Sequence, residues 1–118
     1  SKLAQVISNL VTNAVVHGFP ESANLSDKTL TFTMMERNQR IELTIADNGI
    51  GIEDEFQKHL FDPFYTTNRS QGSTGLGLSI VHNVLTGVLA GSIDVTSQVD
   101  QGTEFTISLP KVIEINWA

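Results

Sequence analysis

The 118-residue sequence contains no cysteine, no long apolar run and few basic residues, and each absence excludes a class of function. Without cysteine the chain forms no disulfide, offers no catalytic thiol and builds no cysteine-ligated zinc site. No apolar run is long enough to span a bilayer, and the N-terminus lacks the basic and then apolar order of a secretory signal. We therefore expect a soluble domain that works in the cytoplasm.

The charge balance restricts the partners of the chain. Seven basic residues stand against thirteen acidic ones, which gives a net charge of −6 at pH 7. A nucleic-acid duplex would be repelled, so we expect no nucleic-acid partner, and an anionic ligand would need backbone amides or a metal ion to hold it. The length suits one domain over residues 1–118. Its abrupt start inside a helical pattern indicates an N-terminally truncated fragment of a longer protein.

The first half of the chain predicts a helix and two strands. Apolar residues recur at the spacing of one helix face, at Leu3, Val6, Ile7, Leu10, Val11, Ala14 and Val15. Gly18, as a left-handed cap, and Pro20 would end this helix. After a polar loop, "TLTFTMME" (residues 29–36) and "RIELTIAD" (residues 40–47) alternate as half-buried strands of an antiparallel pair.

The second half of the chain repeats this order. "EDEFQKHLF" (residues 53–61) suits a short helix, and residues 62–75 form a long aperiodic loop that we expect to be a lid. A second helix is predicted by the spacing of Gly77, Ile80, Val81, Val84, Leu85 and Val88. Two strands follow, at residues 91–98 and 102–110. The predicted class is α+β, a two-layer α/β sandwich with a mixed, mostly antiparallel sheet and helices on one face.

The stretch "IADNGIGI", residues 45–52, has two interpretations. Asp-Asn-Gly between apolar runs is typical of a hairpin turn, in which Asp47 would only start the turn. However, Asp47 shares the parity of Ile45, so on a strand it points inward, where a carboxylate is costly unless it is paired. The residues after Gly51 predict a helix rather than a returning strand. Gly49 and Gly51 then indicate places where the backbone closely approaches another group.

Polar residues form a stripe along the first predicted helix. Asn9, Asn13 and His17 are spaced i, i+4, i+8, which at about 100° per residue places them along the rim of the apolar face. The stripe could be an ordinary polar flank, but asparagine is a poor helix former and gains nothing in mid-helix. Amide oxygens suit Mg²⁺, which takes its other oxygens from waters and phosphates.

A glycine-rich segment precedes the second predicted helix. Gly75 and Gly77 would leave backbone N–H groups free at a helix start, which is a ready anion site. A dinucleotide-binding fingerprint would need a strand directly upstream, and here the upstream segment is the polar loop. A simple flexible loop is the other interpretation of these glycines.

Taken in order, these motifs resemble the ATP-binding catalytic domain of bacterial sensor histidine kinases. This domain belongs to the GHKL superfamily, whose members share the Bergerat nucleotide-binding fold. The matching segments are "QVISNLVTNAVVHG" (N box), "DNGIG" (G1), "FDPFYTT" (F box), "GSTGLGLSIV" (G2) and "GTEFTISLP". The match covers nearly the whole chain, and the four named motifs in this order are far more specific than any one of them.

The resemblance implies which residues bind ATP and Mg²⁺. Asn13 matches the residue that binds the Mg²⁺ bridging the ATP phosphates, and Asn9 lines the same site, so these two are the expected catalytic residues. Asp47 matches the acceptor of a hydrogen bond from the adenine amino group, and Thr103 matches a residue that assists it. The other expected contacts with the nucleotide are His17, Gly49, Gly51, Ile52, Phe64, Arg69, Gly75, Leu76, Gly77 and Leu78.

These contacts have distinct implied roles. His17 falls where the family places a ring beside the adenine, and Gly49 and Gly51 let the backbone pass close to the base. Phe64 matches the aromatic at the base of the lid, and residues 75–78 match the segment whose amides hold phosphates. Three positions depart from the family pattern: many relatives have a basic residue at Val16, a lysine at Asn68 and a glycine at Ser73.

The implied reaction transfers the γ-phosphoryl group of ATP to a histidine nitrogen, largely by positioning and by charge neutralisation through Mg²⁺. His17, His59 and His82 all lack the adjoining motif of a phosphoacceptor, so we expect the acceptor on a separate dimerisation domain. The expected partners are that histidine-containing domain of the same protein and the receiver domain of a response regulator. The fragment is expected to be a monomer and its parent a homodimer at the inner membrane.

Three other functions compete with this one. A GHKL ATPase of the gyrase or mismatch-repair type would carry a glutamate where Asn9 stands, and an amide cannot act as a base. An anti-sigma serine kinase is a free-standing relative of similar size. A non-catalytic nucleotide-binding module would keep the fold, and the departures at Val16 and Asn68 motivate that alternative.

Overall fold

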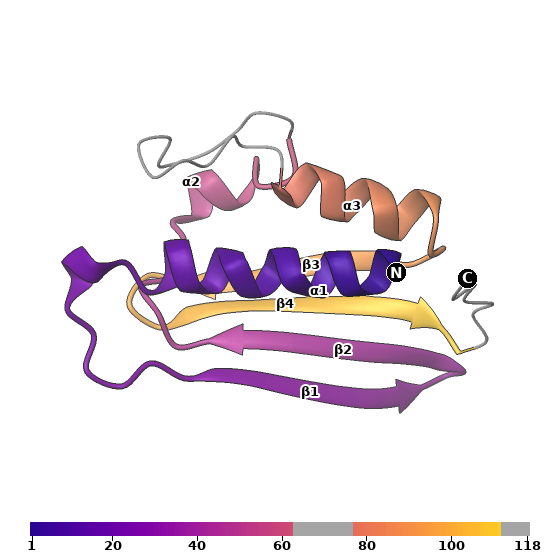
Figure 1. Ribbon diagram of the computed structural model, residues 1–118, viewed down its shortest axis with the longest axis horizontal. Helices are drawn as coiled ribbons and strands as arrows, with labels where there is room; N and C mark the ends of the chain where they lie inside the picture. Colours follow the sequence, from indigo (N-terminus) through magenta and orange to yellow (C-terminus); the bar gives the residue numbers. More distant parts are fainter. Residues whose placement is uncertain (63–76, 112–118) are drawn as a thin grey trace.

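The computed structural model describes residues 1–62 and 77–111 as helices on one face of a β-sheet (Figure 1). The elements in chain order are α1 (Lys2–Asn13), the π-helical turn η1 (Ala14–Gly18), the short turn η2 (Glu21–Ala23), β1 (Leu30–Arg37), β2 (Arg40–Asp47), α2 (Asp54–Gln57), α3 (Gly77–Gly87), β3 (Ser92–Gln98) and β4 (Gly102–Pro110).

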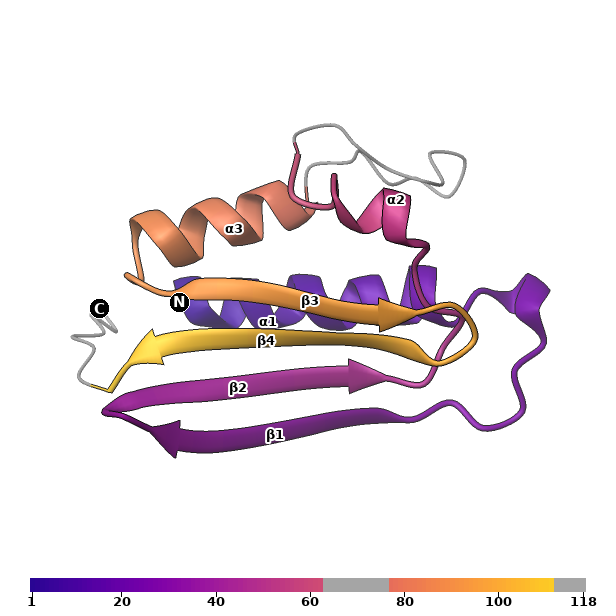
Figure 2. The same cartoon turned by 180° about the vertical axis from the view of Figure 1, so that it is seen from behind.

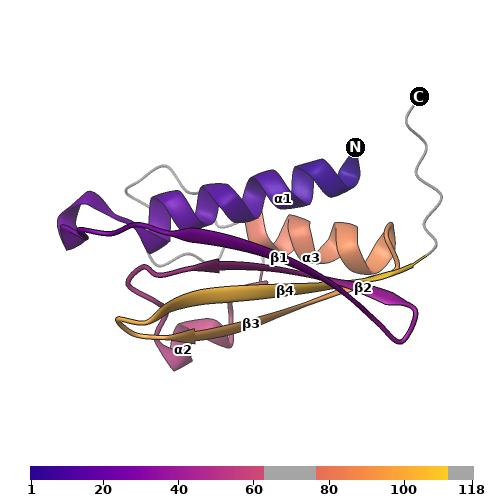
Figure 3. The same ribbon diagram turned by 90° about the horizontal axis from the view of Figure 1, so that it is seen from below.

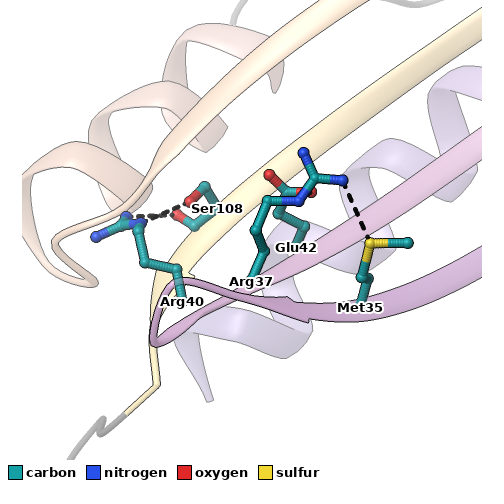
Figure 4. A network of polar contacts seen from close by, with 5 residues as sticks. All are labelled: Met35, Arg37, Arg40, Glu42 and Ser108. Carbon is teal, nitrogen blue, oxygen red and sulfur yellow. Dashed lines mark hydrogen bonds and ion pairs between the residues drawn. The ribbon is translucent and has the colours of Figure 1, made fainter.

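The sheet has four strands in the order β1-β2-β4-β3, and each neighbouring pair is antiparallel. The two predicted hairpins, β1 with β2 and β3 with β4, are both present. The central pair, β2 with β4, joins the two halves of the chain. Its register sets Asp47 opposite Thr103 and Arg40 opposite Pro110. At the Arg40 end, the guanidinium Nε of Arg40 donates to Ser108 Oγ of β4 at 2.7 Å (Figure 4). Arg37 of β1 and Glu42 of β2 form an ion pair between the neighbouring two strands.

The core lies between the sheet and the paired helices α1 and α3, which run antiparallel to each other (Figures 1 and 2). Every second residue of β2 and β4 faces this layer, as the alternation in the sequence predicts. The short helix α2 lies beside β3, away from α1 (Figure 3). The buried core residues are Val6, Leu10, Leu43, Ile45, Val81, Leu85, Ile93, Phe105, Ile107 and Leu109.

Strand β1 is less buried than its sequence predicts. Phe32 and Met34 share a face with the buried residues of β2, yet their side chains are 51% and 70% exposed. Among the described elements β1 pairs with β2 alone, so it forms an edge of the sheet. The prediction of a half-buried strand was therefore wrong, because alternation reports the face of a residue and not whether a helix covers that face.

The end of the first helix also differs from the prediction. The α-helix stops at Asn13 and continues as one π-helical turn, in which Phe19 N donates to Ala14 O at 3.0 Å. Val15, which the helical spacing assigned to the apolar face, lies in this turn and is 55% exposed. Gly18 lies inside this turn and does not have the positive φ of a left-handed cap. The helical spacing of the sequence could not reveal this change of pitch.

The position of β1 predicts unequal effects of mutation within one row of the sheet. Phe32 and Ile45 are cross-strand partners. Ile45→Ala should lower the free energy of unfolding by about 2–5 kcal/mol, since it opens a cavity in the core. Phe32→Ala removes a larger but half-exposed side chain and should cost about 1 kcal/mol. Urea unfolding of both variants provides the measurement. Equal losses of the free energy of unfolding would contradict the position of β1 as an exposed edge strand.

Candidate functional site

The carboxylate of Asp47 stands at the end of β2, on the face of the sheet that carries the helices. One of its oxygens, Oδ1, accepts two backbone hydrogen bonds, from Gly49 N at 2.9 Å and from Thr103 N at 3.3 Å. The other oxygen, Oδ2, makes no hydrogen bond within the described part of the chain. The inward direction expected from parity is confirmed. The hairpin interpretation fails, because the next element after the loop is α2.

The π turn brings the end of the first helix against this carboxylate. A Cβ placed on Gly18 would lie 3.1 Å from Cγ and from both oxygens of Asp47. Gly18 O also accepts a hydrogen bond from Ile50 N at 2.9 Å. Any larger residue at position 18 would press on Asp47. Gly18 is thus part of the site, although its sequence context indicated only a helix end.

Gly49 and Gly51 are required by contacts within the protein. A Cβ on Gly49 would lie 2.0 Å from Gly18 O, and one on Gly51 would lie 2.0 Å from Gln98 O. Gly51 also has a φ of 75°, which side chains rarely adopt. The interpretation that these glycines primarily make room for a ligand needs correction, since the protein's own backbone fills that space. Their contact with a base stays a prediction.

A second set of polar contacts lies beside Asp47 and was not predicted. The buried Ser97 hydroxyl accepts from Ile52 N at 2.8 Å, donates to Gly102 O at 2.8 Å and lies 2.9 Å from Thr103 Oγ1. The amide Nε2 of Gln57 donates to Ile52 O at 2.8 Å and to Ser97 O at 3.0 Å. These bonds fasten the loop after Asp47 to β3. A serine with the inward parity of Ile93 was the one sequence signal for this network.

Burial changes the pKa of both titratable groups in the site. Desolvation raises the pKa of Asp47, and the hydrogen bonds from Gly49 and Thr103 offset this only in part. Desolvation also lowers the pKa of His17 below its ordinary value, so its ring is neutral at pH 7. Both shifts have one cause, which is that the site is partly withdrawn from water.

The described part of the structure includes only some of the remaining predicted residues. Asn9, Asn13 and His17 are half-buried along α1 and η1, as expected for the rim of the apolar face. Leu78, near the start of α3, packs against the core. Among the other histidines, His59 Nδ1 lies 2.9 Å from Asp62 Oδ2, and the His82 ring lies 5.6 Å from Phe61. The positions outside the described residues are Phe64, Asn68, Arg69, Ser73, Gly75 and Leu76.

Residues 1–113 match the histidine kinase-, DNA gyrase B- and HSP90-like ATPases. The chain belongs to this ATPase family. It is 39% identical over 114 residues to the sensor histidine kinase RppB of Synechocystis sp., which covers 93% of this chain and 24% of RppB. The chain therefore spans about a quarter of the length of RppB.

Solved structures support the same family. The nucleotide-free catalytic domain of histidine kinase ThkA has a TM-score of 0.76 at 26% identity, over 93% of this chain and 66% of that one. Full-length ShkA in complex with AMPPNP has a TM-score of 0.76 at 25% identity, over 92% of this chain and 21% of that one. The resemblance inferred from the motifs and the α+β fold are both confirmed for this ATPase-family chain.

Replacement of Gly49 and of Gly87 by alanine should have opposite effects on stability, because only Gly49 is packed against another part of the backbone. Gly49→Ala should lower the free energy of unfolding by about 3 kcal/mol, because its Cβ would overlap the backbone of Gly18. Gly87→Ala is the matched control, since its Cβ meets nothing within 4 Å in α3. It should stabilise the chain by about 0.5 kcal/mol. Chemical denaturation measures both, and a harmless Gly49→Ala would refute the close contact.

The raised pKa of Asp47 predicts that Asp47→Asn stabilises the fold at neutral pH. The amide Oδ1 can still accept from Gly49 and Thr103, while the costly buried charge is gone. We expect the thermal midpoint to rise by about 2–4 °C at pH 7. Because the folded pKa is raised, the wild type regains this difference as pH falls through the folded pKa of Asp47 toward its unfolded value.

Thermal unfolding of both proteins across this acidic range checks the prediction. Asp94→Asn, which changes an exposed aspartate on β3, serves as the control and should leave the midpoint nearly unchanged. A midpoint for Asp47→Asn below that of the wild type at neutral pH would show that the ionised carboxylate stabilises the fold, contrary to this account.

Proposed function

We propose that this chain is the ATP-binding catalytic domain of a sensor histidine kinase. It would bind Mg²⁺ with ATP and transfer the γ-phosphoryl group to a histidine on a separate dimerisation domain. The observation that carries this proposal is the half-buried Asp47 carboxylate, in which two backbone amides hold Oδ1. An ionised carboxylate only accepts hydrogen bonds, so Oδ2 complements an exocyclic amino group such as that of adenine.

The phosphates would extend from this point along the first helix. Gly18 lies beside Asp47, and His17, Asn13 and Asn9 follow backward along η1 and α1. The N-terminal end of α3 is directed toward the end of the sheet that holds Asp47, beside α1 (Figures 1 and 2). Helix N-termini favour anions. A nucleotide with its base at Asp47 would thus have both asparagines and the start of α3 along its phosphates.

The donor set near Asn13 fits Mg²⁺ held jointly with a nucleotide. Within residues 1–62 and 77–111, no three His, Cys, Asp or Glu side chains gather as a metal cage. An amide oxygen from Asn13, completed by phosphate and water oxygens, is the arrangement that Mg²⁺ accepts in such sites. The bound ion would neutralise phosphate charge. Asn9, one turn away, would line the same region.

Kinase activity is favoured over hydrolysis by the residue types in the site. The amide of Asn9 cannot take a proton from water, which a hydrolase of this superfamily would require. RppB and ThkA are named histidine kinases, and ShkA, which is similar to this chain in fold, is solved with AMPPNP. These similarities support phosphotransfer to a protein histidine rather than to water.

The phosphoacceptor would come from outside this chain. His17 is neutral and half-buried, His59 contacts Asp62, and His82 packs near Phe61. We propose that residues 1–118 are the catalytic domain of a longer kinase, since they match only about a quarter of RppB. Its partners would be its own histidine-containing dimerisation domain and a response-regulator receiver domain. The parent would be a homodimer at the inner membrane.

Within the described part of the chain, none of the helices has the length and apolarity needed to cross a membrane.

ATP binding should depend on Mg²⁺ and on two residues. Asp47→Asn and Asn13→Asp should each weaken binding at least about tenfold, or about 1.4 kcal/mol. The first loses an acceptor for the amino group, and the second changes the charge beside the phosphates. Asn38→Asp, an exposed change in the turn between β1 and β2, is the matched control and should bind normally.

Titration of a fluorescent ATP analogue, with and without Mg²⁺, measures these affinities. Failure of the wild-type chain to bind the analogue would refute the proposed function. Equal binding by the wild type and the three variants would mean that ATP binds at a different place, and it would refute the assigned site.

A further inference from the structure

Ser97 fastens the loop after Asp47 to β3, and it is also buried next to Thr103. Its side chain is 8% exposed, and Thr103 is 6% exposed. Ser97 lies on β3 and Thr103 on β4, and the two are cross-strand partners on the face that carries the helices. Thr103 is in turn the partner of Asp47 on β2. The three side chains therefore form one row across three strands, at the edge of the proposed adenine site.

The protons of this row can be assigned from the hydrogen bonds. A hydroxyl has one proton to donate and two lone pairs that accept. Ser97 Oγ gives its single proton to Gly102 O and receives the N–H of Ile52. In the remaining contact, with Thr103 Oγ1 at 2.9 Å, Ser97 can only accept. Thr103 must therefore be the donor, and its own proton is committed to Ser97.

With this assignment, the side chains of the row offer a ligand only hydrogen-bond acceptors. The Thr103 hydroxyl keeps lone pairs but has no proton to offer, and the ionised Asp47 carboxylate has none either. A purine with an amino group at position 6 can donate to such a pair, directly or through water. A purine with a carbonyl there presents an acceptor to acceptors, which leaves buried polar groups unpaired.

We propose that Ser97 is a positioning residue that sets the donor direction of Thr103 and thereby makes the site select 6-amino over 6-oxo purine nucleotides. This inference rests on the proposed ATP-binding function. Ser97 acts through Thr103 and touches no nucleotide itself. Removing its hydroxyl frees the Thr103 proton, which can then donate to a 6-carbonyl group.

The test compares the affinities of the 118-residue chain for ATP and for inosine triphosphate, which differ in the group at position 6 and in the proton that inosine carries at N1. The wild type should prefer ATP by at least about tenfold. Ser97→Ala should reduce this preference by at least about fivefold, because inosine triphosphate gains a donor. Ser92→Ala, an exposed serine on the same strand, is the matched control and should keep the preference.

A double-mutant cycle separates this role from a structural one. Thr103→Val removes the hydroxyl on which Ser97 is inferred to act. In the Thr103→Val background, Ser97→Ala should not change the preference further, whereas a general loosening of the loop would change it in both backgrounds. Thermal unfolding of each variant reports whether it is folded.

The outcomes are distinguishable. A wild-type chain that binds neither nucleotide refutes the proposed function, and the inference falls with it. A wild type that prefers ATP, with an unchanged preference in Ser97→Ala or an equal drop in both backgrounds, overturns the inference and leaves the proposed function intact. If Ser97→Ala does not fold, Thr103→Ser should keep the preference and Thr103→Val should lower it, and equal preferences would overturn the inference.

Discussion

The site depends on the carboxylate of Asp47. The fold partly removes this carboxylate from water, and it supplies hydrogen-bond donors to only one of the two oxygens. Gly49 N and Thr103 N both donate to Oδ1 of Asp47. The first donor is local, in the turn that directly follows the carboxylate. The second comes from the other half of the chain, and the pairing of β2 with β4 delivers it. Without that pairing Asp47 would lose a donor and its place opposite Thr103.

The backbone around Asp47 is packed so closely that glycine is required at several points. Gly18 leaves room for the carboxylate, and Gly49 leaves room for the carbonyl of Gly18. On the other side of the loop, Asp100 N donates to Ile50 O at 2.7 Å. The loop after β2 is thus held between the π turn and the turn joining β3 to β4. Such a clamp fixes the direction of Oδ2 without a hydrogen bond to that oxygen from the described residues.

The stability of the fold and its proposed function place opposite demands on Asp47. Desolvation raises its pKa, so the ionised form is disfavoured, yet only the ionised form presents acceptors alone. Functional sites often retain groups of this kind at a cost in stability. Desolvation likewise keeps His17 neutral at pH 7, so its ring brings no positive charge to the site.

The sequence by itself determined the class of the fold, the helical stripe of Asn9 and Asn13, and the inward direction of Asp47. These follow from periodicities of one segment, which depend on local backbone geometry alone. Only the tertiary structure decided that Phe32 is exposed at a sheet edge, that the first helix ends in a π turn, and that Ser97 joins Thr103. Each of these depends on which segments become neighbours, and residues far apart in the chain leave no periodic signal of their contact.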